Sequence, residues 1–208
     1  MTKTMILRSA LPSPFGRKVK IAAKVLGLWD EIDLKLADTT DPADDLRKQN
    51  PLGKIPTLIP QGHAPIYDSA VIMAYLDARA GGAKIIPADA SKWDVLTLEA
   101  LADGMMDAAI LQIYEKRFRP EEIRHAPWVG YQADKVTRGL DYLSANLDRV
   151  GEVEGLPNVG QITTACTLGY LDFRFEGAWR TVYPTLVSWL DRFDKAVPAF
   201  AETAPPKA

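Results

Sequence analysis

Residues 1–80 change repeatedly between two hydrophobic patterns. Short apolar or alternating runs predict buried strands at Met5–Leu7 and Ile32–Leu36. Between them, apolar residues recur at helical spacing up to Gly27, which is placed as a C-terminal cap: Val19, Ala22, Ala23 and Leu26. This switching is typical of βαβ units.

The same region continues with a second helix, a hairpin and a third helix. Asp41-Pro42 predicts a helix start, with further acidic residues near the positive end of the helix dipole, and the helix ends before Asn50-Pro51. Residues 57–59 and 65–67 predict an antiparallel hairpin. A helix with a largely apolar face follows Asp68-Ser69. The predicted order is βαβαββα.

No strand pattern follows residue 92. Gly81-Gly82 and the polar stretch to residue 91 predict a linker, so the chain divides into an α/β domain at 1–80, a linker at 81–91 and an all-α domain at 92–208. Helical spacing predicts four long helices, from Lys92 to about Tyr114 and over 129–150, 159–173 and 184–197.

Composition and charge exclude several classes of protein. The chain has 25 Lys and Arg against 27 Asp and Glu, without the basic excess of a nucleic-acid binder. It has no apolar run of roughly 18 to 20 residues that could span a membrane, and its first residues lack a secretory signal pattern. The single Cys166 can form neither an internal disulfide nor a multi-cysteine zinc site. We expect a cytoplasmic protein without a structural metal.

Three short motifs in the first domain could carry chemistry. Ser13 precedes the first helix, where free amides favour an anion, although a helix cap alone would also explain the serine. Pro56 opens a strand, and a cis Ile55-Pro56 bond would turn the backbone of Ile55 outward toward a peptide-like ligand. Asp68-Ser69 begins a helix and could bind the ammonium and carboxylate of an amino acid, or simply cap that helix.

Taken together, the motifs resemble the glutathione site of the cytosolic glutathione transferases. The resemblance extends to Asn158-Val159-Gly160-Gln161, similar to the family's capping box, and to the helix after it, so it covers nearly the whole chain. It implies a thioredoxin-like first domain (βαβαββα), an all-helical second domain and a homodimer.

The resemblance also implies roles for individual residues. Ser13 aligns with the activating serine of the serine-type classes, with Ser9 as the alternative. Ile55, before a cis Pro56, would pair with the cysteinyl backbone of glutathione, and Asp68 and Ser69 would hold its γ-glutamyl end. Lys54 and Gln49 would lie toward its glycyl carboxylate.

Two absences narrow the mechanism. No tyrosine follows the first strand and no cysteine lies in the first domain, so tyrosine-type activation and mixed-disulfide chemistry are both disfavoured. Cys166 is interpreted as a packing residue. We expect the electrophile pocket to be lined by the loop after the first strand and by the first long helix, through Leu11, Pro12, Met105, Met106, Ala109, Ile110 and Ile113.

The sequence therefore predicts conjugation of glutathione, as co-substrate, to small hydrophobic electrophiles, as in detoxification. The alternatives are a glutathione-dependent isomerase or reductive lyase of a specific metabolite, and a non-catalytic relative that binds glutathione or a protein. Neither nucleic acid nor membrane is an expected partner.

Overall fold

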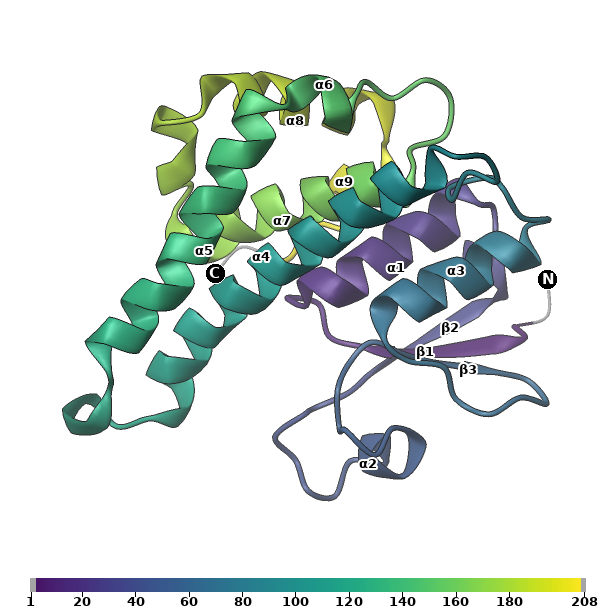
Figure 1. Ribbon diagram of the computed structural model, residues 1–208. Coiled ribbons are helices and arrows are strands. Elements are labelled where there is room, and N and C mark those ends of the chain that lie inside the picture. The colour runs from purple at the N-terminus through teal and green to yellow at the C-terminus, as the bar shows by residue number, and fades with distance from the viewer. Residues whose placement is uncertain (1–2, 207–208) are drawn as a thin grey trace.

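The computed structural model describes residues 3–206, which begin with a small mixed sheet (Figure 1). Its strands are β1 (Met5–Ser9), β2 (Ile32–Leu36) and β3 (Thr57–Pro60), in the order β2-β1-β3. β2 runs parallel to β1, and β3 runs antiparallel to it with Arg8 opposite Thr57. The end of β1 and the start of β3 therefore lie at the same edge of the sheet.

Helices α1 (Pro14–Val25) and α3 (Ser69–Arg79) lie side by side over one face of this sheet, and α2 (Leu46–Gln49) lies away from them (Figure 1). The short helical turn Trp29–Glu31 precedes β2. Pro14 suits the first turn of α1 because its missing amide would have no partner there. The buried face of α1 supplies Val19, Ile21, Ala22 and Ala23 to the core. The expected thioredoxin-like arrangement is confirmed.

Two details differ from the predicted elements. The second hairpin strand is reduced to one antiparallel bridge, in which Leu58 and Ile66 exchange both backbone hydrogen bonds. In this register the neighbouring donors on the same strand edge would be residues 56 and 60, and both are prolines without an amide hydrogen. Each further pair would therefore lack one of its two hydrogen bonds, and the pairing stops at a single bridge.

The predicted helix start at Asp41-Pro42 is wrong, because α2 begins only at Leu46. The carboxylate of Asp41 accepts from the amide of Ala43, and that of Asp44 accepts from the amides of Asp38 and Leu46. These side-chain bonds fold the segment into turns and delay the helix.

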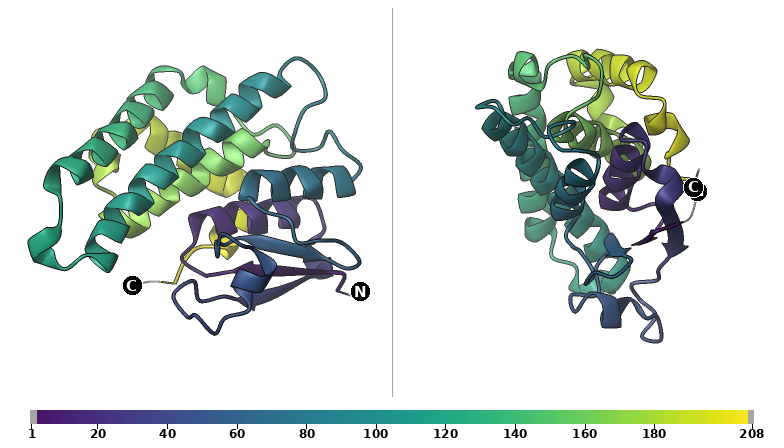
Figure 2. Two further views of the ribbon diagram at one scale, coloured as in Figure 1. Left: turned by 60° about the horizontal axis from the view of Figure 1, so that its bottom comes forward. Right: turned by 90° about the vertical axis from the view of Figure 1, so that its right-hand side faces the viewer.

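Helices make up the rest of the chain (Figure 2). Residues 80–91 form turns and bends. The helices that follow are α4 (Lys92–Phe118), α5 (Ala126–Ala145), α6 (Leu147–Val150), α7 (Val159–Phe175), α8 (Pro184–Ala196) and α9 (Ala199–Glu202), with short turns at Glu121–Ile123 and Ala178–Thr181. α7 is the central one: it packs against both α4 and α1, and its first ten residues are all buried. No helix within residues 3–206 is long and apolar enough to cross a membrane.

The predicted capping box at the start of α7 is present. The side chain of Asn158 accepts from the amide of Gln161 at 2.9 Å, and that of Gln161 accepts from the amide of Asn158 at 3.1 Å. The Gln161 side chain also donates to the carbonyls of Val150 and Glu152. Gln161 thus fixes both the start of the central helix and the loop that leads to it.

The end of the chain returns to the first domain. Arg17 on α1 donates to the carbonyl of Phe200 on α9 at 2.7 Å, and its guanidinium carbon lies 3.8 Å from the centroid of the Phe200 ring. Burial lowers the pKa of Arg17, although its usual value is so high that the charge is kept. This cation–π contact joins the α/β layer to the last helix.

Candidate functional site

Ser13 is the N-cap of α1. Its backbone is extended, with φ −74° and ψ 119°, and its Oγ accepts from the amide of Gly16 at 3.1 Å. Because the oxygen accepts this bond, the hydroxyl proton stays available for another acceptor. The side chain is half-buried. Ser13 therefore acts as a cap, and it can also donate toward an anion at the positive end of α1.

Ser9 lies in a different environment. It ends β1 and is fully buried, and a Cβ built on Gly16 would lie 2.0 Å from its Oγ. The Ser9 hydroxyl is therefore packed against the first turn of α1. Of the two candidate serines, only Ser13 is reached by solvent.

The loop before β3 has the expected backbone. The Ile55–Pro56 bond is cis, Pro56 is buried and Ile55 is half-buried. Among residues 3–206, no protein group is hydrogen-bonded to the N–H or C=O of Ile55. Asn50 organises the loop, because its side chain donates to the carbonyl of Lys54 and to Thr57. The backbone N–H and C=O of Ile55 are thus left without a partner among the described residues.

The third motif begins α3. The carboxylate of Asp68 accepts from the amide of Ala70 at 3.1 Å, and Asp68 itself is exposed. Ser69 is buried at the first position of the helix. Asp68 is therefore both a cap and an accessible negative charge. The Tyr67–Asp68 bond that leads into it is also cis.

The side chains of Lys54 and Gln49 differ in their exposure and in their hydrogen bonds. Lys54 is exposed, whereas the Gln49 side-chain oxygen accepts from Arg8 at 2.7 Å. Arg8 also pairs with Asp44 at 2.6 Å. Gln49 thus already belongs to a network that joins β1 to the segment around α2.

The residues expected around an electrophile fall into two groups. Leu11 is exposed, and Pro12, Ile110 and Ile113 are half-buried. Met106 and Ala109 are fully enclosed in the hydrophobic core. As packed, these two residues support the helix, and pocket lining remains a prediction for the more accessible four.

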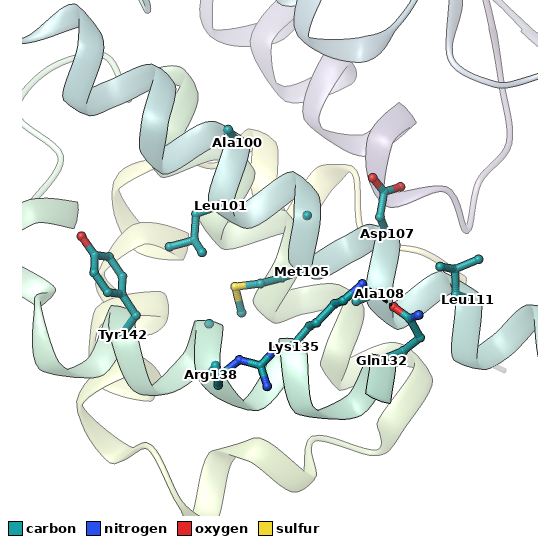
Figure 3. Close-up of a pocket in the computed structure, with 12 residues that line it drawn as sticks. Ala100, Leu101, Met105, Asp107, Ala108, Leu111, Gln132, Lys135, Arg138 and Tyr142 are labelled. Atoms are coloured by element: carbon teal, nitrogen blue, oxygen red, sulfur yellow. Dashed lines mark hydrogen bonds between the residues drawn. The ribbon is translucent and has the colours of Figure 1, made fainter. Parts of the chain in front are cut away.

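Met105 faces away from the sheet domain. It lines a cavity of about 610 Å³ between α4 and α5, and a Cβ on Gly139 would lie 2.4 Å from its sulfur. Figure 3 shows the Met105 sulfur directed toward α5, opposite Lys135 and Arg138. The structure therefore places Met105 in the contact between the two longest helices.

A charged cluster that was not predicted from the sequence lies between α1 and α4. The ammonium of Lys18 is 3.1 Å from Glu99 and 2.8 and 2.7 Å from the two oxygens of Asp103. The side chain of Lys18 is fully buried. Glu99, Asp103 and Asp107 are spaced by four along α4, a pattern that indicates one helix face. Only the structure shows that a lysine of another helix meets it.

The acidic face of α4 lies near two of the three motifs. Burial raises the pKa of Asp107, with Lys54 acting against the shift and Asp68 adding to it. Burial also raises the pKa of Asp103 to about 6, with Asp68 again adding to the shift. Lys54 and Asp68 therefore lie close enough to this face for their charges to act on it.

Cys166 lies far inside α7. It is fully buried, and burial raises the pKa of its thiol to about 11. The thiolate is the reactive form, so burial keeps Cys166 in its less reactive thiol form. No group of three metal-ligating side chains was found within residues 3–206.

Comparison with known proteins decides the family. Residues 7–84 match the family described as glutathione S-transferase, N-terminal domain. The uncharacterized GST-like protein YibF of Escherichia coli (strain K12) is 32% identical over 206 residues, which cover 98% of this chain and all of YibF. The chain belongs to the glutathione S-transferase family.

Solved structures of glutathione S-transferases agree over the whole length. One from Methylobacillus flagellatus KT, with glutathione bound, is 36% identical with a TM-score of 0.89, and the match covers 97% of this chain and 100% of that one. A glutathione transferase family member from Pseudomonas fluorescens Pf-5, also with bound glutathione, is likewise 36% identical with a TM-score of 0.89. That match covers 98% of this chain and 100% of the Pseudomonas chain. The glutathione S-transferase resemblance seen in the sequence is thus confirmed, together with the fold.

Proposed function

We propose that this chain is a glutathione transferase that conjugates the glutathione thiolate to small hydrophobic electrophiles, with Ser13 as the group that stabilises the thiolate. One observation carries the proposal: the Ser13 oxygen accepts from the amide of Gly16 while its own proton remains available. A serine bonded in this way is a fixed donor at the positive end of a helix.

The chemical task is to ionise a thiol. An ordinary thiol with a pKa of about 8.5 is only slightly ionised at neutral pH, and the thiolate is the nucleophile. A donor that lowers this pKa by about two units supplies roughly 2.7 kcal/mol in favour of the thiolate. Serine does this without forming a covalent bond, and the thiolate then attacks the electrophile and displaces its leaving group or adds to its double bond.

Binding of the tripeptide would use the other two motifs. The unpaired N–H and C=O of Ile55 match the backbone of the cysteinyl residue, and the exposed carboxylate of Asp68 matches the γ-glutamyl ammonium, with Ser69 beside it. Lys54 and Gln49 would face the glycyl carboxylate. Two solved relatives hold glutathione, which supports glutathione as the ligand.

The electrophile would meet the thiolate between the loop after β1 and α4. Leu11, Pro12, Ile110 and Ile113 offer the apolar surface for it. The buried Ser9 hydroxyl favours Ser13 as the activating group. We further propose a cytoplasmic homodimer with a role in detoxification.

The test is a direct assay of the purified chain. We expect the chain to be retained on immobilised glutathione and to conjugate a chlorinated nitrobenzene. Adding glutathione to the chain at neutral pH should also produce the ultraviolet absorbance of the thiolate. A chain that binds glutathione without forming thiolate would be a non-catalytic relative. Turnover restricted to an isomerisation or a reductive cleavage would support the corresponding alternative.

A further inference from the structure

The cluster around Lys18 contains one more negative charge than it needs. Lys18 is fully buried, and either Glu99 or Asp103 alone would neutralise its ammonium. Both carboxylates are present, with side chains 5% and 22% exposed. The contact between α1 and α4 therefore holds a net charge of −1 when all three groups are ionised.

Ionised Asp103 costs stability. Its pKa is raised from 3.8 to about 6, mainly by burial, with the negative charges of Glu99 on α4 and Asp68 at α3 adding to the shift and Lys18 on α1 opposing it. On α7 the facing titratable group is the Cys166 thiol, which stays neutral. The folded chain thus binds this proton more tightly than the unfolded chain. The stability contributed by the protonated form is present below about pH 4 and is lost as the pH rises to about 6.

The position of Lys18 links this charge to Ser13. Ser13 caps the first turn of α1 through the amides of Gly16 and Arg17, and Lys18 is the next residue. Both oxygens of Asp103 lie within hydrogen-bond distance of the Lys18 ammonium, whereas Glu99 makes a single contact at 3.1 Å. Asp103 is therefore the main anchor that α4 offers to the first half of α1.

We propose that Asp103 is a positioning residue, which holds Lys18 and thereby fixes the first turn of α1 so that Ser13 is aligned with the glutathione thiolate. This inference rests on the proposed function. It explains why a carboxylate is kept in a place where its ionised form destabilises the fold, since alignment of a catalytic donor is a common reason for such a cost. Protonation of Asp103 leaves Lys18 to Glu99 and loosens the alignment.

The decisive variant is Asp103→Asn, which keeps the shape of the side chain and removes its charge. Asp94→Asn is the matched control, because Asp94 lies on the same helix with its side chain 79% exposed. We expect Asp103→Asn to raise the pKa of the bound glutathione thiol by about half a unit or more. The free variant should melt at a higher temperature than the wild type at pH 7, and the difference should shrink toward pH 4. The control should leave the thiol pKa unchanged, and it should not melt above the wild type, because Asp94 lies in the first turn of α4, where a negative charge is favourable.

The sign of the thiol shift separates positioning from simple electrostatics. Removing a nearby negative charge would by itself favour the thiolate, so a lowered or unchanged thiol pKa would overturn the proposal. If Asp103→Asn melted at or below the wild-type temperature at pH 7, the ionised carboxylate of Asp103 would not be destabilising the fold. That result would also overturn the proposal.

A second readout keeps the inference distinct from the proposed function. If the wild type forms no thiolate with glutathione, the proposed function fails, and amide hydrogen exchange at residues 15–18 then reports the first turn of α1 directly. Faster exchange in Asp103→Asn than in Asp94→Asn would support the role of Asp103 in fixing that turn. Equal exchange would reject it.

Discussion

Lys18 and Asp103 meet across the contact between α1 and α4, with the ammonium 2.8 and 2.7 Å from the two carboxylate oxygens. Lys18 is the only cation bonded to Asp103 and Glu99 within residues 3–206. The two helices belong to the α/β part and the helical part of the chain, so the pair connects the two. Replacing either partner tests how strongly that connection holds.

Lys18→Met should destabilise the protein by about 3–5 kcal/mol at neutral pH, because two buried carboxylates lose their counter-ion. The loss should be smaller near pH 5, where Asp103 is largely protonated. Urea unfolding at both pH values measures it. Lys48→Met, at a lysine whose side chain is 83% exposed, is the control and should be nearly neutral. Equal effects of the two substitutions would contradict a structural role for the buried pair.

Ser13→Ala should reduce conjugation of a chlorinated nitrobenzene by roughly tenfold or more, while glutathione affinity stays within a few-fold. Loss of the α1 cap should cost about 1 kcal/mol of stability in addition. Steady-state kinetics and calorimetric binding separate the two effects. Ser9→Ala, at the buried serine, is expected to keep most of the turnover. If Ser9→Ala lost activity and Ser13→Ala did not, the assignment of the two serines would be reversed.

Asp68→Ala should weaken binding of glutathione, because an exposed carboxylate suited to the γ-glutamyl ammonium is lost. Calorimetry should compare glutathione with a tripeptide analogue that lacks the α-amino group. The analogue should bind the wild type weakly and lose little more in the variant. Equal losses for both ligands would show that Asp68 does not contact the ammonium and acts only as the cap of α3.

Gln161→Ala should lower the free energy of unfolding by about 2–4 kcal/mol. The substitution removes the Gln161 half of the capping box and leaves the buried carbonyl of Val150 and the partly buried carbonyl of Glu152 without their donors. Thermal melting measures the loss. Gln61→Ala, at an exposed glutamine in a turn, should melt like the wild type. A small effect at Gln161 would mean that water replaces its bonds.

Local pattern was sufficient for most of the fold. The period of the apolar residues located α1, α3, α5, α7 and α8, and local cap chemistry identified Ser13 and Asp68. The Asn158–Gln161 box was identified through the family resemblance. The shortened hairpin was also readable in principle, because Pro56 and Pro60 remove the two donors that would extend its ladder. These features depend on residues close together in the sequence.

Features that depend on distant residues were not predicted. Lys18 meets Glu99 and Asp103 from 81 and 85 residues away, and nothing in the pattern of α1 distinguishes a buried lysine from a solvated one. Burial of Met106 and Ala109 likewise depends on how α7 packs against α4. Helical spacing indicates which residues share a face, but the partner of that face is set by the tertiary structure.

The hydrogen bond and the cation–π contact between Arg17 and Phe200 join residues that lie 183 positions apart in the sequence. Removing α9 would take away the carbonyl and the ring of Phe200 and leave the buried Arg17 guanidinium without these contacts. The α/β part alone would therefore be a poor candidate for expression as a separate fragment. On heating, the α/β part and the helical part should melt in one calorimetric transition. Helix α9 would then belong to the same folding unit as β1.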